Sequence, residues 1–132
     1  MTVKEKATSY HNRGFNCAQS VLFSVGAYTG LDEKTGLAIA AGFGGGLRCG
    51  EVCGAVSGAV MAAGMCCPYV DEHDLAAKEK IADLSRTLTA AFQARFGALR
   101  CEEIKGDKAM CPVYIEFMAE LAEKTLQELN SK

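Results

Sequence analysis

The sequence is short of the features that mark several large classes of protein. Its formal net charge of −2 at pH 7 provides no basic surface for nucleic acid or for an anionic membrane. Only Arg48 and Glu51 are charged between positions 35 and 70, yet no uncharged run there reaches the roughly 20 apolar residues that a membrane-spanning helix needs. The charged first residues also lack the apolar segment of a secretory signal. We therefore expect a soluble cytoplasmic protein that neither inserts into a membrane nor binds nucleic acid.

Strand signals are missing as well, because no segment alternates apolar and polar residues with a two-residue period. Capping residues and glycines instead divide the chain into helices. The expected helices cover residues 3–13, 17–29, 32–41, about 50–65, 71–96 and 101–105, with a last helix that starts at Pro112 after a break at Gly106. There is neither a linker nor an internal repeat. The sequence therefore predicts one all-α domain over residues 1–132, a compact helical bundle with a central glycine-rich helix.

Small residues form a stripe along the expected central helix. Gly50, Gly54, Gly58 and Ala62 recur every four residues, so on a helix they share one side and let another backbone approach closely. Each interior glycine costs about 0.8–1 kcal/mol of helix stability relative to alanine, which indicates that the close approach is used. The stripe serves packing alone, or it also presses neighbouring thiols against another element. A second copy of the chain could use the same stripe, so a homodimer is one expectation.

Cysteine is the most informative residue type in the chain. The seven cysteines are Cys17, Cys49, Cys53, Cys66, Cys67, Cys101 and Cys111. An odd number without a secretion signal argues against a disulfide scaffold. In a reducing compartment, clustered cysteines indicate metal ligands or redox-active thiols, although free cysteine is also one of the most buried residue types. The spacing matches neither C-x-x-C nor a paired zinc-finger pattern, so the chain has no standard metal or thioredoxin-type motif.

Two cysteines are expected at the starts of helices. Cys17 follows Asn16, which is a good N-cap, and Cys111 precedes Pro112, which suits the first position of a helix. The positive end of the helix dipole favours the thiolate, the form of cysteine that attacks disulfides and binds metals. We therefore expect reactive or metal-ligating thiols at Cys17 and Cys111.

Cys49 and Cys53 stand four positions apart at the start of the glycine-rich helix. On a regular helix their Cβ atoms lie about 5–6 Å apart, whereas a disulfide needs a separation of about 3.5–4.5 Å. This spacing disfavours a disulfide and allows a shared metal ion or cluster. We therefore expect Cys49 to bind a cofactor beside Cys53.

Several motifs together resemble one known family. They are GFNCAQSV (14–21), GFGGG (42–46), CGAVSGAVM (53–61), and then Cys101 and Cys111. In this order, over about residues 14–112, they resemble the C_GCAxxG_C_C family of redox proteins, which is named for four cysteines, the second inside a Cys-Gly-Ala-x-x-Gly motif. The four match Cys17, Cys53, Cys101 and Cys111 here, and Gly54, Ala55 and Gly58 complete the motif.

The resemblance implies a small helical bacterial or archaeal protein whose redox activity depends on the four matched cysteines. They would act as catalytic thiols or as metal ligands, with Gly54 and Gly58 as further cofactor-binding residues; Cys49 lies outside the four named cysteines, so its expected part in the site rests on its spacing from Cys53 alone. Related domains occur beside electron-transfer modules, which implies an iron–sulfur cluster as cofactor; zinc, or no cofactor at all, stays open. A redox partner protein is expected.

Three functions therefore remain open. The protein is a thiol oxidoreductase whose low-pKa thiolate attacks a partner disulfide, with a second cysteine that resolves the mixed disulfide. Alternatively, it is an electron carrier in which four thiolates hold a cluster. The competing hypothesis is a non-catalytic metal-binding or assembly module with structural buried thiols.

Overall fold

The computed structural model describes residues 1–104 and 110–130, and the regular elements in this part of the chain are all helices. They are α1 (Val3–Asn12), α2 (Cys17–Ser24), α3 (Gly26–Thr29), α4 (Glu33–Ala40), η1 (Gly46–Gly50), α5 (Gly54–Cys66), α6 (Leu75–Phe96), α7 (Cys101–Ile104) and α8 (Cys111–Asn130). An isolated antiparallel bridge joins Val52 to Arg100. The expected all-α class is confirmed.

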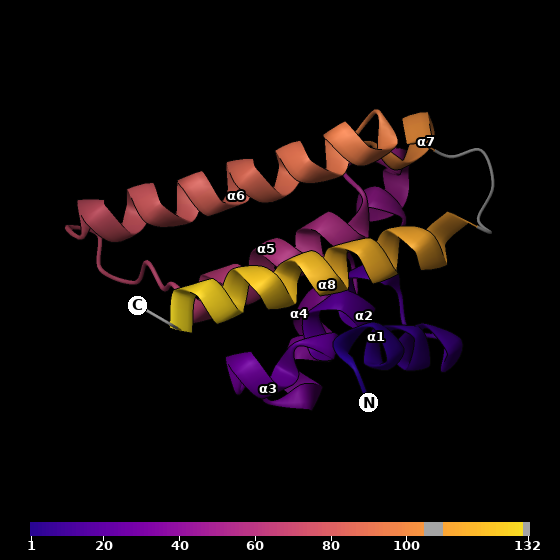
Figure 1. Ribbon diagram of the computed structural model, residues 1–132, viewed down its shortest axis with the longest axis horizontal. Helices are drawn as coiled ribbons and strands as arrows, with labels where there is room; N and C mark the ends of the chain where they lie inside the picture. The colour runs from indigo at the N-terminus through magenta and orange to yellow at the C-terminus, as the bar shows by residue number, and fades with distance from the viewer. Residues whose placement is uncertain (105–109, 131–132) are drawn as a thin grey trace.

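Helix α5 occupies the centre of the bundle and packs against α2, α6 and α8. In Figure 1, α8 crosses in front of α5, α6 runs along one side of this pair, and α1 to α4 cover the other side. The largest fully buried side chains come from all of these layers and include Leu22, Val56, Phe92, Ile115 and Met118. The chain therefore has one core, with the glycine-rich helix passing through it.

Glycines bring the backbone of α5 against the backbone of α2. A Cβ atom at Gly58 would lie only 2.5 Å from the carbonyl oxygen of Ala18. A Cβ at Gly54 would lie 3.1 Å from the Ala18 nitrogen and 3.3 Å from Cβ of Cys17. The expected close approach is therefore confirmed for these two glycines. Because α2 of the same chain fills the stripe, it offers no surface for a second copy.

The expected start of the central helix is wrong. Gly45, Gly46, Leu47, Arg48 and Gly50 all have φ between 61° and 78°, which places most of η1 in the left-handed region. An α-helix cannot continue through such residues. Helix α5 therefore begins only at Gly54, with Cys53 as its N-cap, and Gly50 is not part of the stripe.

Two other boundaries also differ from expectation. The helix expected over 17–29 breaks at Val25 (φ −107°, ψ 22°), which separates α2 from α3. Asp74, and not Asp71, caps α6 by accepting a hydrogen bond from the Ala77 N–H. Gly97 ends α6 as expected, with φ 90°. The expected break at Gly106 lies outside the described residues.

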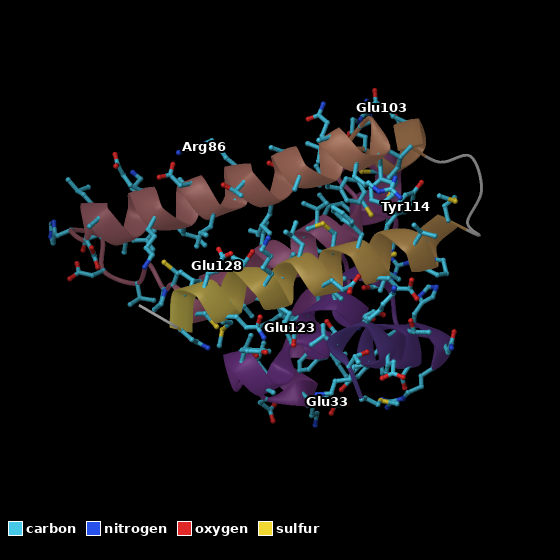
Figure 2. The ribbon with its side chains drawn as sticks, viewed as in Figure 1. Glu33, Arg86, Glu103, Tyr114, Glu123 and Glu128 are labelled. Carbon is cyan, nitrogen blue, oxygen red and sulfur yellow. The ribbon has the colours of Figure 1, made fainter. Side chains whose placement is uncertain are left out.

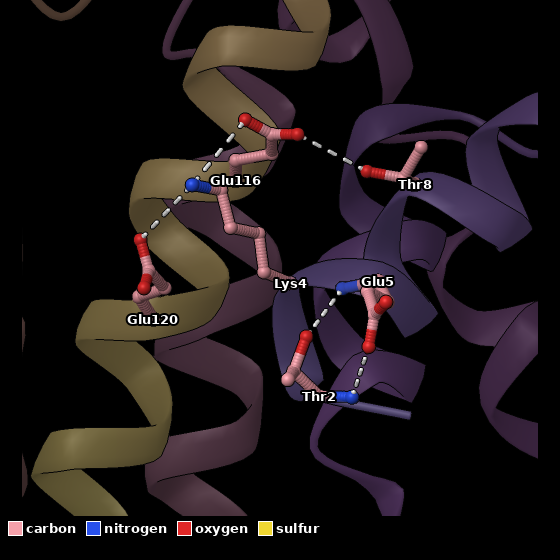
Figure 3. Close-up of polar contacts among 6 residues, drawn as sticks. All are labelled: Thr2, Lys4, Glu5, Thr8, Glu116 and Glu120. Atoms are coloured by element: carbon pink, nitrogen blue, oxygen red, sulfur yellow. Dashed lines mark hydrogen bonds and ion pairs between the residues drawn. The ribbon is translucent and has the colours of Figure 1, made fainter.

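Polar contacts join α1 to α8 along one edge of the bundle (Figure 3). Lys4 Nζ lies 4.0 Å from a carboxylate oxygen of Glu116 and 4.0 Å from one of Glu120, and Thr8 Oγ1 donates to Glu116 Oε1 at 3.3 Å. Exposed ion pairs of this kind contribute at most about 1 kcal/mol each. Apolar burial, as at the fully buried Ala7, therefore does more to hold α1 in place.

The contact between α2 and α5 gives a first prediction. Replacing Gly58 by Ala is expected to lower the free energy of unfolding by about 1–3 kcal/mol, because the new methyl group meets the Ala18 backbone. Gly64 lies on the same helix with no atom within 4 Å of its added Cβ, so Gly64→Ala is the matched control. That control should gain up to about 1 kcal/mol of stability. Urea unfolding measures both, and a Gly58→Ala protein as stable as the control would contradict the prediction.

Candidate functional site

Each of four cysteines stands at the beginning of a helix. Cys17 is the first residue of α2, Cys53 is the N-cap of α5, Cys101 begins α7, and Cys111 begins α8. Helix starts at Cys17 and Cys111 were expected and are confirmed. Backbone N–H groups that lack a partner within the helix, and the positive end of the dipole, lie at each of these positions. All four belong to the residues that the resemblance selects.

Backbone hydrogen bonds hold Cys53 beside Cys101. The Cys53 N–H donates to the carbonyl of Leu99 at 2.9 Å, and the Cys101 N–H donates to the carbonyl of Glu51 at 2.7 Å. An ion pair between Arg100 and Glu51, at 3.1 Å, lies across the same bridge. Two residues far apart in the sequence are thus fixed in register at the point where α5 and α7 begin.

Asn16 and Gln19 fix the start of the helix that carries Cys17. Asn16 Oδ1 accepts from the Gln19 N–H, and Gln19 Oε1 accepts from the Asn16 N–H, which completes a capping box. Asn16 Nδ2 also donates to the carbonyls of Ala40 and Ala41 at the end of α4. The amides in the GFNCAQS motif therefore have a structural role, because they tie α4 to the helix that begins at Cys17.

Burial controls the protonation of these thiols. Burial is the main cause that raises the pKa values of Cys17, Cys53 and Cys101. The pKa of Cys53 reaches about 12. For Cys53, a hydrogen bond from the Ala55 N–H opposes the increase. The positive end of the helix dipole favours the Cys17 thiolate, but loss of water at this buried position has the larger effect on its pKa. These three thiols are therefore protonated near neutral pH.

Electrostatic repulsion shows that the four sulfurs form one group, the quartet. After burial, the Cys53, Cys111 and Cys101 thiolates all raise the pKa of Cys17. Cys101 and Cys111 likewise raise the pKa of Cys53. Such effects require charges that lie close together in a medium of low polarity. The structure thus gathers Cys17, Cys53, Cys101 and Cys111 from four helices.

Within the quartet the thiols form two pairs. Burial raises the pKa of Cys53 and of Cys17 most; besides charge, a side-chain interaction with Cys101 raises the pKa of Cys53, and one with Cys111 raises that of Cys17. Each pair joins a buried thiol, with Cys53 2% and Cys17 9% exposed, to a partly exposed one, Cys101 or Cys111. Among the described residues, no three Cys, His, Asp or Glu side chains surround a common point as ligands of one metal ion. The quartet is therefore arranged as two pairs of thiols, Cys53 with Cys101 and Cys17 with Cys111.

The other predicted positions lie apart from the quartet or beside it. Cys49 is exposed in η1, with its Sγ 3.6 Å from the Gly46 carbonyl, so the expectation that it shares a helix face with Cys53 is wrong. Gly58 lies one turn beyond Gly54 on α5 and packs on α2. Cys66, at the far end of α5, directs its thiol toward the carbonyl of Tyr28 at 3.5 Å.

Comparison with known families matches residues 15–125 to the family described as "Putative redox-active protein (C_GCAxxG_C_C)". The chain belongs to this family. No curated protein and no solved structure shows a significant match to it. The matched range includes all four cysteines of the quartet. None of the described helices has the length and apolar character needed to cross a membrane.

Tyr114 is a residue beside the quartet that the sequence did not reveal. It is 5% exposed, and burial raises its pKa most, followed by the thiolates of Cys53, Cys111 and Cys101. Its hydroxyl donates to the carbonyl of Ile104, the last residue of α7, at 2.9 Å. The position three residues after Cys111 was the available signal, since residues so spaced share a helix face.

The raised pKa of Cys53 predicts a loss of stability in alkali. In the unfolded chain Cys53 loses its proton near the ordinary value of 9.0, whereas in the folded protein it keeps the proton to about pH 12. The contribution of Cys53 to the free energy of unfolding is therefore complete below pH 9 and is lost as the pH rises through 12.

Unfolding of the reduced, metal-free protein from about pH 8 to about pH 11 measures this effect. The Cys53→Ala variant, although less stable throughout, should lose stability less steeply with pH than the wild type. Parallel pH dependences of the two proteins would be incompatible with a buried, neutral Cys53.

Proposed function

We propose that the protein is an electron-transfer protein that binds an iron–sulfur cluster through Cys17, Cys53, Cys101 and Cys111. The observation that carries this proposal is the convergence of four thiols, two buried and two partly exposed, each at the start of a different helix, into one electrostatically coupled group. Thiolates are the usual ligands of iron–sulfur clusters.

The electrostatics of the quartet fit a cationic group. Burial and mutual repulsion keep the thiols of Cys17, Cys53 and Cys101 protonated when no positive charge is near. Metal ions deprotonate a coordinating thiol, so iron would replace the protons and remove the repulsion. The helix starts favour the negative charge that a cluster with four thiolates carries.

The two pairs also fit a centre with two irons better than a single zinc ion. One zinc ion needs its four donors around a common point, and the described residues contain no such set. In a [2Fe–2S] centre four cysteines are divided between two irons, as the pairs Cys53–Cys101 and Cys17–Cys111 would allow. Zinc is therefore the weaker candidate.

The residues around the quartet would hold and tune this centre. The cluster supplies one-electron redox chemistry when it is bound. The Gly54 N–H donates to the sulfur of Cys101, and the Ala55 N–H donates to that of Cys53. Hydrogen bonds to ligand sulfurs stabilise negative charge and raise the reduction potential of such centres. Burial of Cys17 and Cys53 excludes water from the inner side.

A second candidate is thiol–disulfide exchange, which the electrostatically coupled pair of Cys53 and Cys101 favours. The partly exposed Cys101, as thiolate, would attack one sulfur of a partner protein's disulfide and release the other as a thiolate. Cys53, after losing its proton, would attack the Cys101 sulfur and release the partner. Two electrons pass to the partner, and one intramolecular disulfide forms. The raised pKa of Cys101 makes this the slower chemistry.

The partner and the compartment complete the proposal. Cys101 and Cys111 are the partly exposed members of the quartet, so a redox partner protein would approach from their side. The seven free cysteines suit a reducing compartment such as the cytoplasm.

Anaerobic purification followed by iron, sulfide and zinc analysis tests the cluster. The wild-type protein, as purified or after reconstitution with ferrous iron and sulfide, should contain both elements and absorb visible light. Serine at any position of the quartet should abolish or strongly reduce bound iron, whereas Cys66→Ser, the matched control, should leave it unchanged. Cys49→Ser tests the separate expectation that Cys49 binds the cofactor. A wild-type protein that stays colourless and free of iron after reconstitution would refute the proposal.

Disulfide mapping tests the second candidate. If the quartet works by exchange, mild oxidation of the metal-free protein should give the disulfides Cys53–Cys101 and Cys17–Cys111, and dithiothreitol should reverse both. Peptide mass spectrometry without reduction identifies the pairs. Quartet thiols that remain free and do not react with an alkylating reagent would exclude this function.

A further inference from the structure

We propose that Tyr114 is a positioning residue that fixes Cys101 in the quartet by holding the C-terminal end of α7. The inference rests on the proposed function, since it assigns a task beside the same site. Tyr114 extends from α8 toward the end of the bundle where α7 lies (Figure 2). It forms no part of the motif by which the family is named.

Helix α7 needs contacts with other elements in order to form. It has only four residues, Cys101–Ile104, and an isolated helix of this length is not stable in water. The carbonyl groups in the last turn of a helix lack partners within the helix. At this position the Tyr114 hydroxyl supplies one, because it donates to the Ile104 carbonyl at 2.9 Å.

Different contacts hold the two ends of α7. At the N-terminal end, the Cys101 N–H donates to the Glu51 carbonyl at 2.7 Å, next to the bridge between Val52 and Arg100. At the C-terminal end, the contact comes from another helix, since the Tyr114 hydroxyl on α8 donates to the Ile104 carbonyl. The hydroxyl of Tyr114 therefore limits how far α7, and with it the Cys101 thiol, can move away from Cys53.

Tyr114 is itself held rigidly. Its ring packs edge-on against Phe96, with centroids 4.7 Å apart, and against Phe92, with centroids 5.6 Å apart. On α8 it stands three residues after Cys111, so it belongs to the same helix as one partly exposed thiol and bonds to the helix of the other. One side chain thus fixes the spacing between Cys111 and Cys101.

Alkylation of the reduced, metal-free protein tests this role. Tyr114→Phe removes the hydroxyl and keeps the ring. Losing one hydrogen bond of ordinary strength should raise the rate at which iodoacetamide modifies Cys101 by about 3- to 10-fold. Cys66, at the far end of α5, serves as internal reference and should react at its wild-type rate. Site-resolved mass spectrometry gives both rates.

Two controls separate positioning from a general loss of stability. Tyr28→Phe removes a similar hydrogen bond, in which the Tyr28 hydroxyl donates to Glu123 Oε2 at 3.0 Å, and should leave the Cys101 rate unchanged. 4-Aminophenylalanine at position 114 keeps a donor and should restore the slow rate. A wild-type Cys101 rate in Tyr114→Phe, or equal increases at Cys101 and Cys66, would overturn the proposal.

Hydrogen exchange of the wild-type protein provides a measurement that does not depend on the folding of any variant. The Ile104 N–H donates to the Arg100 carbonyl at 3.0 Å, so a held α7 should protect it from exchange. Exchange of this amide at the rate of an unstructured peptide would also overturn the proposal. Neither assay involves iron, so a protein that never binds a cluster could still confirm the position of Tyr114, and the two proposals can fail separately.

Discussion

The direct contact between the backbones of α2 and α5 is the constraint on which the site depends. Gly58 and Gly54 leave room for Ala18, and this separation places Cys17, at the start of one helix, near Cys53, ahead of the other. A side chain at Gly58 would push α2 and α5 apart and would therefore increase the distance between the sulfurs of Cys17 and Cys53. The small residues of the Cys-Gly-Ala-x-x-Gly motif therefore set a distance between thiols, although they carry no reactive group.

Two physical effects of opposite sign act on the thiols of the quartet. The helix starts and nearby N–H groups favour negative sulfur, whereas burial and the neighbouring thiolates oppose it. Burial has the larger effect at Cys17, Cys53 and Cys101, and these sulfurs keep their protons. A site of this kind is a poor nucleophile and a good ligand, because a metal ion replaces the protons and makes use of the same N–H groups. This balance is why cluster binding fits the structure better than thiol exchange.

Much of the fold followed from local sequence signals. Glycines, caps and helical periodicity predicted the helical class and the starts of α2 and α8, and the motif selected the cysteines that the structure gathers. The left-handed turn over residues 45–50 could not be predicted, because Leu47 and Arg48 rarely adopt positive φ and carry no local sign of it. That turn moved the start of α5 and separated Cys49 from Cys53. The role of Tyr114 was also hidden, because α7 is placed by pairing with residues near Glu51, far away in the sequence.

The four cysteines are distributed along the chain from position 17 to position 111. Any group held by all of them would therefore act as a crosslink that closes several long loops at once. Such a crosslink removes chain entropy from the unfolded ensemble, and tight binding to the native state alone shifts the folding equilibrium by mass action. Loss of the bound group would then be felt throughout the bundle as reduced cooperativity of unfolding. Binding of such a group and folding of the chain would then be thermodynamically linked.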